Sequence, residues 1–192
     1  MDILELMKKR RSIRKYQAKQ VPRDIVDKIV EAGLYAPNAG GGQRSMIVTL
    51  HNACLTEKLG RLNFSTFDRN QLLGAHVSAE QPSVIDDPKI KNGFYDAPTV
   101  CVIFGQKDFL YNVADAFCMA ENMILAAHEL GVDSCIISRA EETFALPAGK
   151  RFMQEWGVPE NMEAKAFVTL GYCDGPYPQG KPRKKCRNVV IE

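Results

Sequence analysis

The chain has 192 residues, 45% of them hydrophobic and 25% charged, and its formal net charge is +2. This length and composition favour a single folded domain over residues 1–192, or one protomer of an intertwined dimer. The small net charge argues against a dedicated nucleic-acid-binding protein, and no apolar run is long enough to cross a bilayer, so we expect neither a nucleic-acid partner nor a membrane.

Hydrophobic periodicity predicts helices that alternate with short, apolar, β-branched strands. In chain order, the expected helices cover residues 3–11, 22–36, 53–62, 112–130 and 148–157. The expected strands cover residues 46–50, 99–104, 134–138 and 165–172. Residues 63–95 have weak periodicity and predict a variable excursion from the core. There is no internal repeat and no low-complexity linker, so the sequence indicates no domain boundary.

The predicted helix 112–130 is apolar on nearly every face, through Val113, Ala116, Phe117, Met119, Ala120, Met123, Ile124, Ala127 and Leu130. A helix that is apolar all round must be buried all round. One chain of this size has little material to surround it, so the pattern favours a partner subunit. The alternative is a central helix of a monomer.

Cysteine and histidine residues give no sign of a metal site. The six cysteines contain no C-x-x-C pair, and the three histidines lie far apart. Metal sites usually need tighter ligand spacing. We therefore expect no bound metal, reduced thiols and a cytoplasmic location.

The first basic stretch, KKRRSIRK (8–15), contains six cationic residues. Cations in the last turn of a helix are favoured by its dipole, which explains the charges up to Arg11. Ser12 and Arg14 continue the pattern beyond the helix end. Guanidinium groups bind phosphate bidentately and a serine hydroxyl adds a donor, so Arg-x-Ser-x-Arg is suited to a phosphate site. A second basic stretch, KPRKKCR (181–187), is a candidate for the same site.

The loop APNAGGGQ (36–43) places three consecutive glycines after a predicted helix. Such a loop costs backbone entropy but lets the backbone approach a flat ligand closely. The alternative is a flexible surface turn. The Gly-Lys-Ser/Thr of a P-loop is absent here, and no G-x-G-x-x-G opens a helix after a strand, so neither nucleotide motif is supported.

Five segments taken in order resemble the nitroreductase family of FMN-dependent oxidoreductases. They are RRSIRKY (10–16), APNAGGGQ (36–43), FYDAPTVCVIFG (94–105), AFCMAENMILAAHELGVDSCIIS (116–138) and AFVTLGYCDGPYPQGKPRKK (166–185). The resemblance implies an α+β fold, a three-layer α/β/α sandwich around a mixed, mostly antiparallel sheet, in an intertwined homodimer. It also implies that residues 63–95 lie near the substrate pocket and that residues 186–192 form a C-terminal arm toward the partner subunit.

The resemblance further implies which residues hold FMN. Those near the phosphate are Arg10, Arg11, Ser12, Lys181 and Arg183. Arg14 is similar to the cation beside the ribityl chain and the pyrimidine edge, where it stabilises charge on the reduced ring.

Other positions resemble the family's contacts to the flavin ring. Pro37, Asn38, Ala39 and Gln43 belong to a loop that the partner subunit lays against the flavin, although Arg44-Ser45 departs from the usual Pro-Trp after the glutamine. Ser138 and Arg139 lie where a backbone donor meets the reactive nitrogen. Asn70 is a candidate for the pyrimidine edge.

The implied reaction passes hydride from NADH or NADPH via FMN to an oxidised acceptor such as a nitroaromatic, a quinone or an enone, by a ping-pong mechanism. The cofactor carries the chemistry, so no catalytic side chain is expected. Alternatives are a flavin-binding or sensing module without efficient turnover, or a specialised member such as a reductive dehalogenase or a flavin-fragmenting enzyme. A nucleic-acid-binding protein would interleave exposed aromatics with the basic residues, and only Tyr16 and Tyr177 lie near them.

Overall fold

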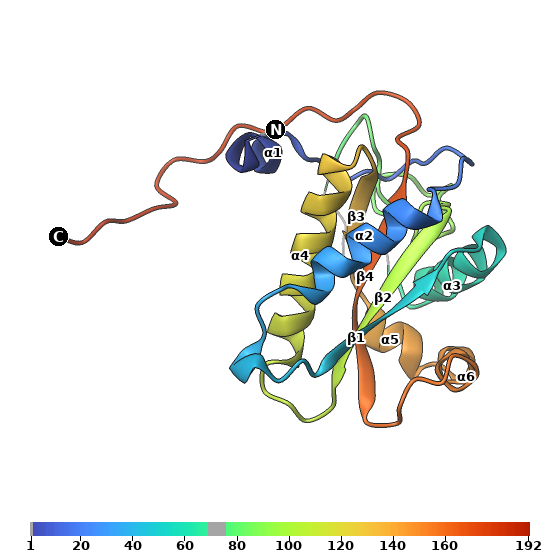
Figure 1. The fold of residues 1–192 in the computed structure, drawn as a ribbon. Coiled ribbons are helices and arrows are strands. Elements are labelled where there is room, and N and C mark those ends of the chain that lie inside the picture. The colour runs from blue at the N-terminus through green and yellow to red at the C-terminus, as the bar shows by residue number, and fades with distance from the viewer. Residues whose placement is uncertain (1, 69–75) are drawn as a thin grey trace.

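A computed structural model describes residues 2–68 and 76–192. Its central sheet has the order β1-β2-β4-β3, formed by β1 (Ser45–Leu50), β2 (Thr99–Gln106), β3 (Asp133–Ile137) and β4 (Met162–Gly171). All three pairings between these strands are antiparallel. Within the described residues, the parallel component is an isolated bridge between Ser12 and Ser134. Helices cover both faces, which confirms the expected α+β sandwich of three layers (Figure 1).

One face of the sheet packs against α2 (Arg23–Leu34) and α4 (Asn112–Glu129). These helices lie close together at Gly33, where an added Cβ would be 2.7 Å from Cγ of Met123. A side chain at this position would push the helices apart, so the glycine allows both helices to contact the sheet.

The other face packs against α3 (Ala53–Ser65), α5 (Ala140–Ala145), α6 (Pro147–Glu155) and the loop before β2. Aromatic rings fill this layer, and the centroids of Phe94 and Phe167 are 4.8 Å apart. Alternate residues of β2 point to opposite faces. Both sets are buried, as predicted for a strand covered on both sides.

The predicted helix 3–11 is too long, because α1 covers only Ile3–Lys9. Arg10 already has an extended backbone, with ψ of 138°. The backbone N–H of Ile13 donates to the carbonyl of Ser134 at 3.0 Å, so the chain leaves the helix to run beside β3. Of the helices in the described part of the chain, none combines the length and apolarity needed to traverse a bilayer.

Candidate functional site

The two basic segments, far apart in sequence, lie together in the structure. After β4 the chain runs antiparallel to the N-terminal segment, with a bridge between Tyr16 and Cys173. The N–H of Asp174 donates to the carbonyl of Lys15 at 2.9 Å. A cavity of about 580 Å³ opens where the segments meet. The predicted residues that line it are Arg10, Arg11, Ser12, Arg14, Lys181 and Arg183.

Two guanidinium nitrogens at this cavity, Nη1 of Arg10 and Nε of Arg11, are buried and have no hydrogen-bond partner among the described residues. Leaving a buried donor unpaired costs on the order of 1–3 kcal/mol, and more for a charged group. Nη1 of Arg11 donates to the carbonyls of Lys8 (2.6 Å) and Arg10 (2.7 Å), which holds the guanidinium in place. The arrangement is therefore suited to an anion that would accept from the remaining donors.

Gly180 allows the C-terminal segment to approach Arg11 closely. An added Cβ at this position would lie 2.0 Å from Nη2 of Arg11. Lys181 is held from the opposite side, where its Nζ donates to the carbonyl of Val77 at 2.9 Å. Segments around residues 11, 77 and 181 thus enclose the same cationic cavity.

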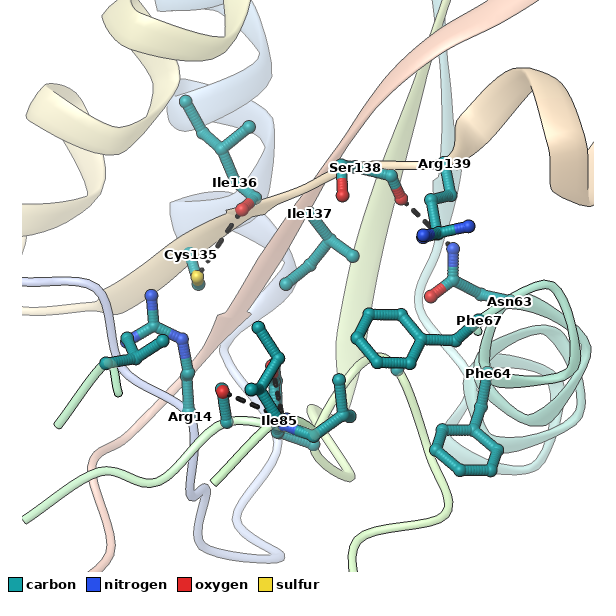
Figure 2. A pocket seen from close by; sticks show the side chains of 15 residues that line it. Arg14, Asn63, Phe64, Phe67, Ile85, Cys135, Ile136, Ile137, Ser138 and Arg139 are labelled. Carbon is teal, nitrogen blue, oxygen red and sulfur yellow. Dashed lines mark hydrogen bonds between the residues drawn. The ribbon is translucent and has the colours of Figure 1, made fainter. Parts of the chain in front are cut away.

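A second cavity, of about 200 Å³, adjoins the first (Figure 2). Arg14 and Val77 line both cavities, so Arg14 stands at their junction. The walls of the second cavity are mostly apolar and aromatic. They come from the end of α3, the loop 83–95 and the segment from Cys135 to Arg139, and include Asn63, Phe64, Phe67, Ile85, Tyr95, Ile136, Ile137 and Ser138. Its lining, together with the adjoining cationic cavity, suits a largely apolar group joined to an anion.

The edge of β3 supplies backbone groups to this second cavity. β3 is an edge strand, and the carbonyl of Ser134 accepts from the N-terminal segment. Since backbone groups alternate in direction along an antiparallel ladder, those of Ile136 and Ser138 point to the same outer edge. The carbonyl of Ser138 accepts from Nδ2 of Asn63 at 3.1 Å. This edge therefore places main-chain groups of Ile136 and Ser138 along the wall of the cavity.

Arg139 follows the strand in a left-handed conformation, with φ of 66°. Its guanidinium carbon lies 4.9 Å from the ring centroid of Phe67, and Nη1 donates to the carbonyl of Thr66 at 2.7 Å. The side chain thus closes the far end of the second cavity and secures the end of α3. Arg14 and Arg139 place a cation at each end of the cavity.

Burial keeps two titratable groups of the second cavity neutral. Burial, followed by the nearby Cys135, raises the pKa of Tyr95 to about 12. Burial also raises the pKa of the Cys135 thiol. Both groups are therefore protonated at pH 7, and neither neutralises the Arg14 guanidinium, which lines the same cavity. The positive charge of Arg14 is available to a ligand.

Four of the other predicted site residues are not brought to these cavities within one chain. Pro37, Asn38, Ala39 and Gln43 lie in the loop around the short helix η1 (Ala39–Gly41), away from the basic segments (Figure 1). The N–H of Ala39 donates to Oδ1 of Asp115 at 3.0 Å, which fixes the loop against α4. Asn70 lies outside the described residues.

Sequence reasoning did not identify several residues that line the second cavity, notably Asn63, Phe67 and Tyr95. Asn63 offered a signal, because it is a polar residue on the buried face of α3. Its Nδ2 also donates to Oγ1 of Thr143 at 3.0 Å. Tyr95 could also have been considered, because it lies within the FYDAP segment quoted above. In the structure its positive φ of 56° strains the backbone beside the cavity.

Comparisons with known proteins agree with this geometry. A nitroreductase with bound FMN from Bacteroides fragilis is 29% identical, with a TM-score of 0.85, and the match covers 100% of both chains. A nitroreductase with bound FMN from Desulfitobacterium hafniense shares the fold at 21% identity, with a TM-score of 0.81, over 100% of this chain and 99% of that one. A protein of Methanothermobacter thermautotrophicus named "Putative NADH dehydrogenase/NAD(P)H nitroreductase" is 27% identical over 90% of this chain and 78% of its own length. The profile of the nitroreductase family matches residues 7–172, and the chain belongs to this family.

Proposed function

We propose that the chain is an FMN-dependent oxidoreductase that uses NADH or NADPH to reduce a nitroaromatic, a quinone or an enone. The observation that carries the proposal is the pair of buried, unpartnered guanidinium nitrogens of Arg10 and Arg11 in the described part of the chain. Both arginines line a cationic cavity, which shares Arg14 with an apolar one. A phosphate monoester attached to a flat aromatic ring fits both compartments. The FMN in the Bacteroides fragilis nitroreductase and the name of the archaeal relative support the same choice.

The residues of this chain fit that cofactor in distinct roles. Arg10, Arg11, Ser12, Lys181 and Arg183 would hold the phosphate through charge-assisted hydrogen bonds. FMN, when bound, supplies the hydride chemistry.

Arg14 would stabilise negative charge that develops at the edge of the ring, because its guanidinium is already in place before the reaction. The backbone of Ser138 and Arg139 would orient the ring along the outer edge of β3. Asn70 is retained as a candidate contact to the pyrimidine edge.

We also propose a ping-pong mechanism. If donor and acceptor use one position over the flavin ring, they cannot bind productively together, and the nicotinamide leaves before the acceptor enters.

We further propose a homodimer in which Pro37, Asn38, Ala39 and Gln43 reach the flavin of the partner subunit. In one chain this loop lies away from the basic segments (Figure 1). The six free cysteines fit a reducing cytoplasm, where we propose that the enzyme acts.

Removing the Arg10 guanidinium tests the phosphate assignment. Arg10→Ala removes a charge-assisted contact, so it should raise the Kd of FMN roughly ten- to a hundredfold, as expected for about 1.5–3 kcal/mol. Riboflavin has no phosphate, and its Kd should change by less than about threefold. Flavin fluorescence titration of the apoprotein measures both constants.

Arg23→Ala is the matched control, because Arg23 pairs with Asp27 on the exposed side of α2, away from both cavities. It should leave both dissociation constants unchanged. Equal losses of FMN and riboflavin binding in Arg10→Ala would show that Arg10 supports the fold and not the phosphate.

Separated half-reactions test turnover. Anaerobic NADH or NADPH should abolish the flavin absorbance of the loaded protein, and a nitroaromatic or quinone added afterwards should restore it. Steady-state rates should give parallel double-reciprocal lines. A loaded protein whose absorbance responds to neither nicotinamide would instead be a flavin-binding module or a specialised enzyme with another donor.

A further inference from the structure

Gln81 is a fully buried polar side chain that connects three segments of the chain. Its Oε1 accepts from the backbone N–H of Arg14 at 2.9 Å. Its Nε2 donates toward the carbonyls of Asp174 at 3.2 Å and Pro176 at 3.3 Å. The same nitrogen lies 3.4 Å from Sγ of Cys173. One amide thus contacts the N-terminal segment at Arg14 and also the antiparallel segment after β4, at Asp174 and Pro176.

The two ends of this amide contact the two basic segments separately. Arg14 belongs to the N-terminal segment and stands at the junction of the cavities. Pro176 leads directly into the segment with Lys181 and Arg183, which contains no helix or strand. Backbone groups that no ladder pairs are satisfied by side chains or water, and Gln81 supplies such a partner to the carbonyls of Asp174 and Pro176. Gln81 therefore links the backbone of Arg14 to the start of the segment that carries Lys181 and Arg183.

Gln81 itself does not line the cationic cavity, although its neighbours Ala79 and Glu80 do. Its side chain is directed away from that space and toward the two strands. Any effect on a ligand must therefore pass through Arg14 and through the segment that follows Pro176.

We propose that Gln81 is a positioning residue for the phosphate end of the cofactor, an inference that rests on the proposed function. Its Oε1 fixes the backbone of Arg14, and its Nε2 fixes the start of the segment that carries Lys181 and Arg183. Bidentate and charge-assisted contacts to phosphate depend steeply on geometry. The residue thus sets the preference for FMN over riboflavin without touching either.

The principal test replaces Gln81 by methionine, which has a similar length but neither donates nor accepts. Gln81→Met should raise the Kd of FMN by about tenfold or more, while the Kd of riboflavin changes by less than about threefold. Hydrogen exchange of the apoprotein should also quicken in residues 174–183, which gives a readout that needs no cofactor.

Gln81→Glu tests the acceptor and the donor of the amide separately. The carboxylate can still accept from Arg14 but cannot donate to Asp174 and Pro176. We expect the quickened exchange to be confined to residues 174–183 in this variant and to extend to residues 12–16 in Gln81→Met.

Gln17 supplies matched controls. Its Nε2 donates to the carbonyl of Cys173 at 2.8 Å, and this exposed contact joins the same two antiparallel segments. Gln17→Met tests the loss of one amide contact, and Gln17→Glu tests an added negative charge on the same N-terminal segment. Both should keep the FMN to riboflavin ratio of the parent.

Each outcome decides the inference. An unchanged ratio in Gln81→Met, an equal loss for both flavins, or the absence of a cooperative thermal transition in both Gln81 variants would show that the residue serves only the fold. A parent protein with no preference for FMN over riboflavin would instead overturn the phosphate assignment itself.

Discussion

Asp86 holds together the irregular segment that carries Gln81. Its Oδ1 accepts from the N–H of Val77 at 3.0 Å, and its Oδ2 accepts from the N–H of Ser83 at 2.8 Å. Nδ1 of His76 lies 2.9 Å from Oδ1. Burial opposes ionisation of this carboxyl, but the hydrogen bonds from Ser83 and Val77 outweigh it and lower the pKa from 3.8 to about 2. The charged form therefore stabilises the folded loop.

Asp86→Asn should destabilise the protein by about 2 kcal/mol at pH 7, because a pKa lowered by nearly two units corresponds to roughly that free energy. Since the pKa is lower in the folded state, this contribution is complete above pH 4 and disappears as the pH falls through 2. The gap between variant and parent should therefore shrink to about half at pH 3. Urea unfolding at both pH values measures it.

Asp27→Asn is the control for this prediction, since Asp27 is exposed and pairs with Arg23 on α2. Its effect should stay within about 0.5 kcal/mol at either pH. A gap for Asp86→Asn that is the same at pH 7 and pH 3 would assign the loss to packing and not to the carboxylate charge.

At the scale of elements, the sheet could be predicted from local pattern. The expected strands at 46–50, 99–104, 134–138 and 165–172 overlap all four strands in the described part of the chain. Short apolar, β-branched runs between turns are typical of buried strands. The ends of the strands could not be predicted from the sequence. β4, for example, begins at Met162, because it pairs with β2 across an irregularity at Ile103/Phe104. Helix α5 was not predicted, because its six residues are too few to show a helical period.

The candidate site, like the sheet, could be predicted from the sequence only in part. Its cationic half could be predicted, since clustered arginines beside a serine stand out in a nearly neutral chain. The remaining parts of the site are positioned by individual contacts between residues that are far apart in the sequence. Gln81 meets Arg14 and Asp174 across 67 and 93 residues of sequence, and such contacts leave no periodicity to detect.

At the scale of the whole molecule, one chain leaves much apolar surface uncovered. α4 buries Ala116, Ala120 and Met123 against α2 and the sheet, while Val113 remains 48% exposed and Phe117 41% exposed. Further exposed side chains lie in α1 and in the extended C-terminal segment (Figure 1): Ile3, Leu4, Met7, Val189, Val190 and Ile191. Exposed large apolar side chains in this number favour a protein interface. They favour the partner subunit inferred from the sequence of α4.

The homodimer proposal predicts that the C-terminal arm stabilises the dimer. Replacing Val189, Val190 and Ile191 by serine keeps the length of the arm but removes three side chains, each worth about 1.5–3 kcal/mol when fully buried. The parent should sediment as a dimer, and the variant should dissociate at a concentration at least about tenfold higher. Lys184→Ser with Lys185→Ser alters two exposed residues of the same segment and should leave the dimer intact. A parent that sediments as a stable, flavin-loaded monomer would contradict the dimer, and the loop 36–43 would then have no partner flavin to contact.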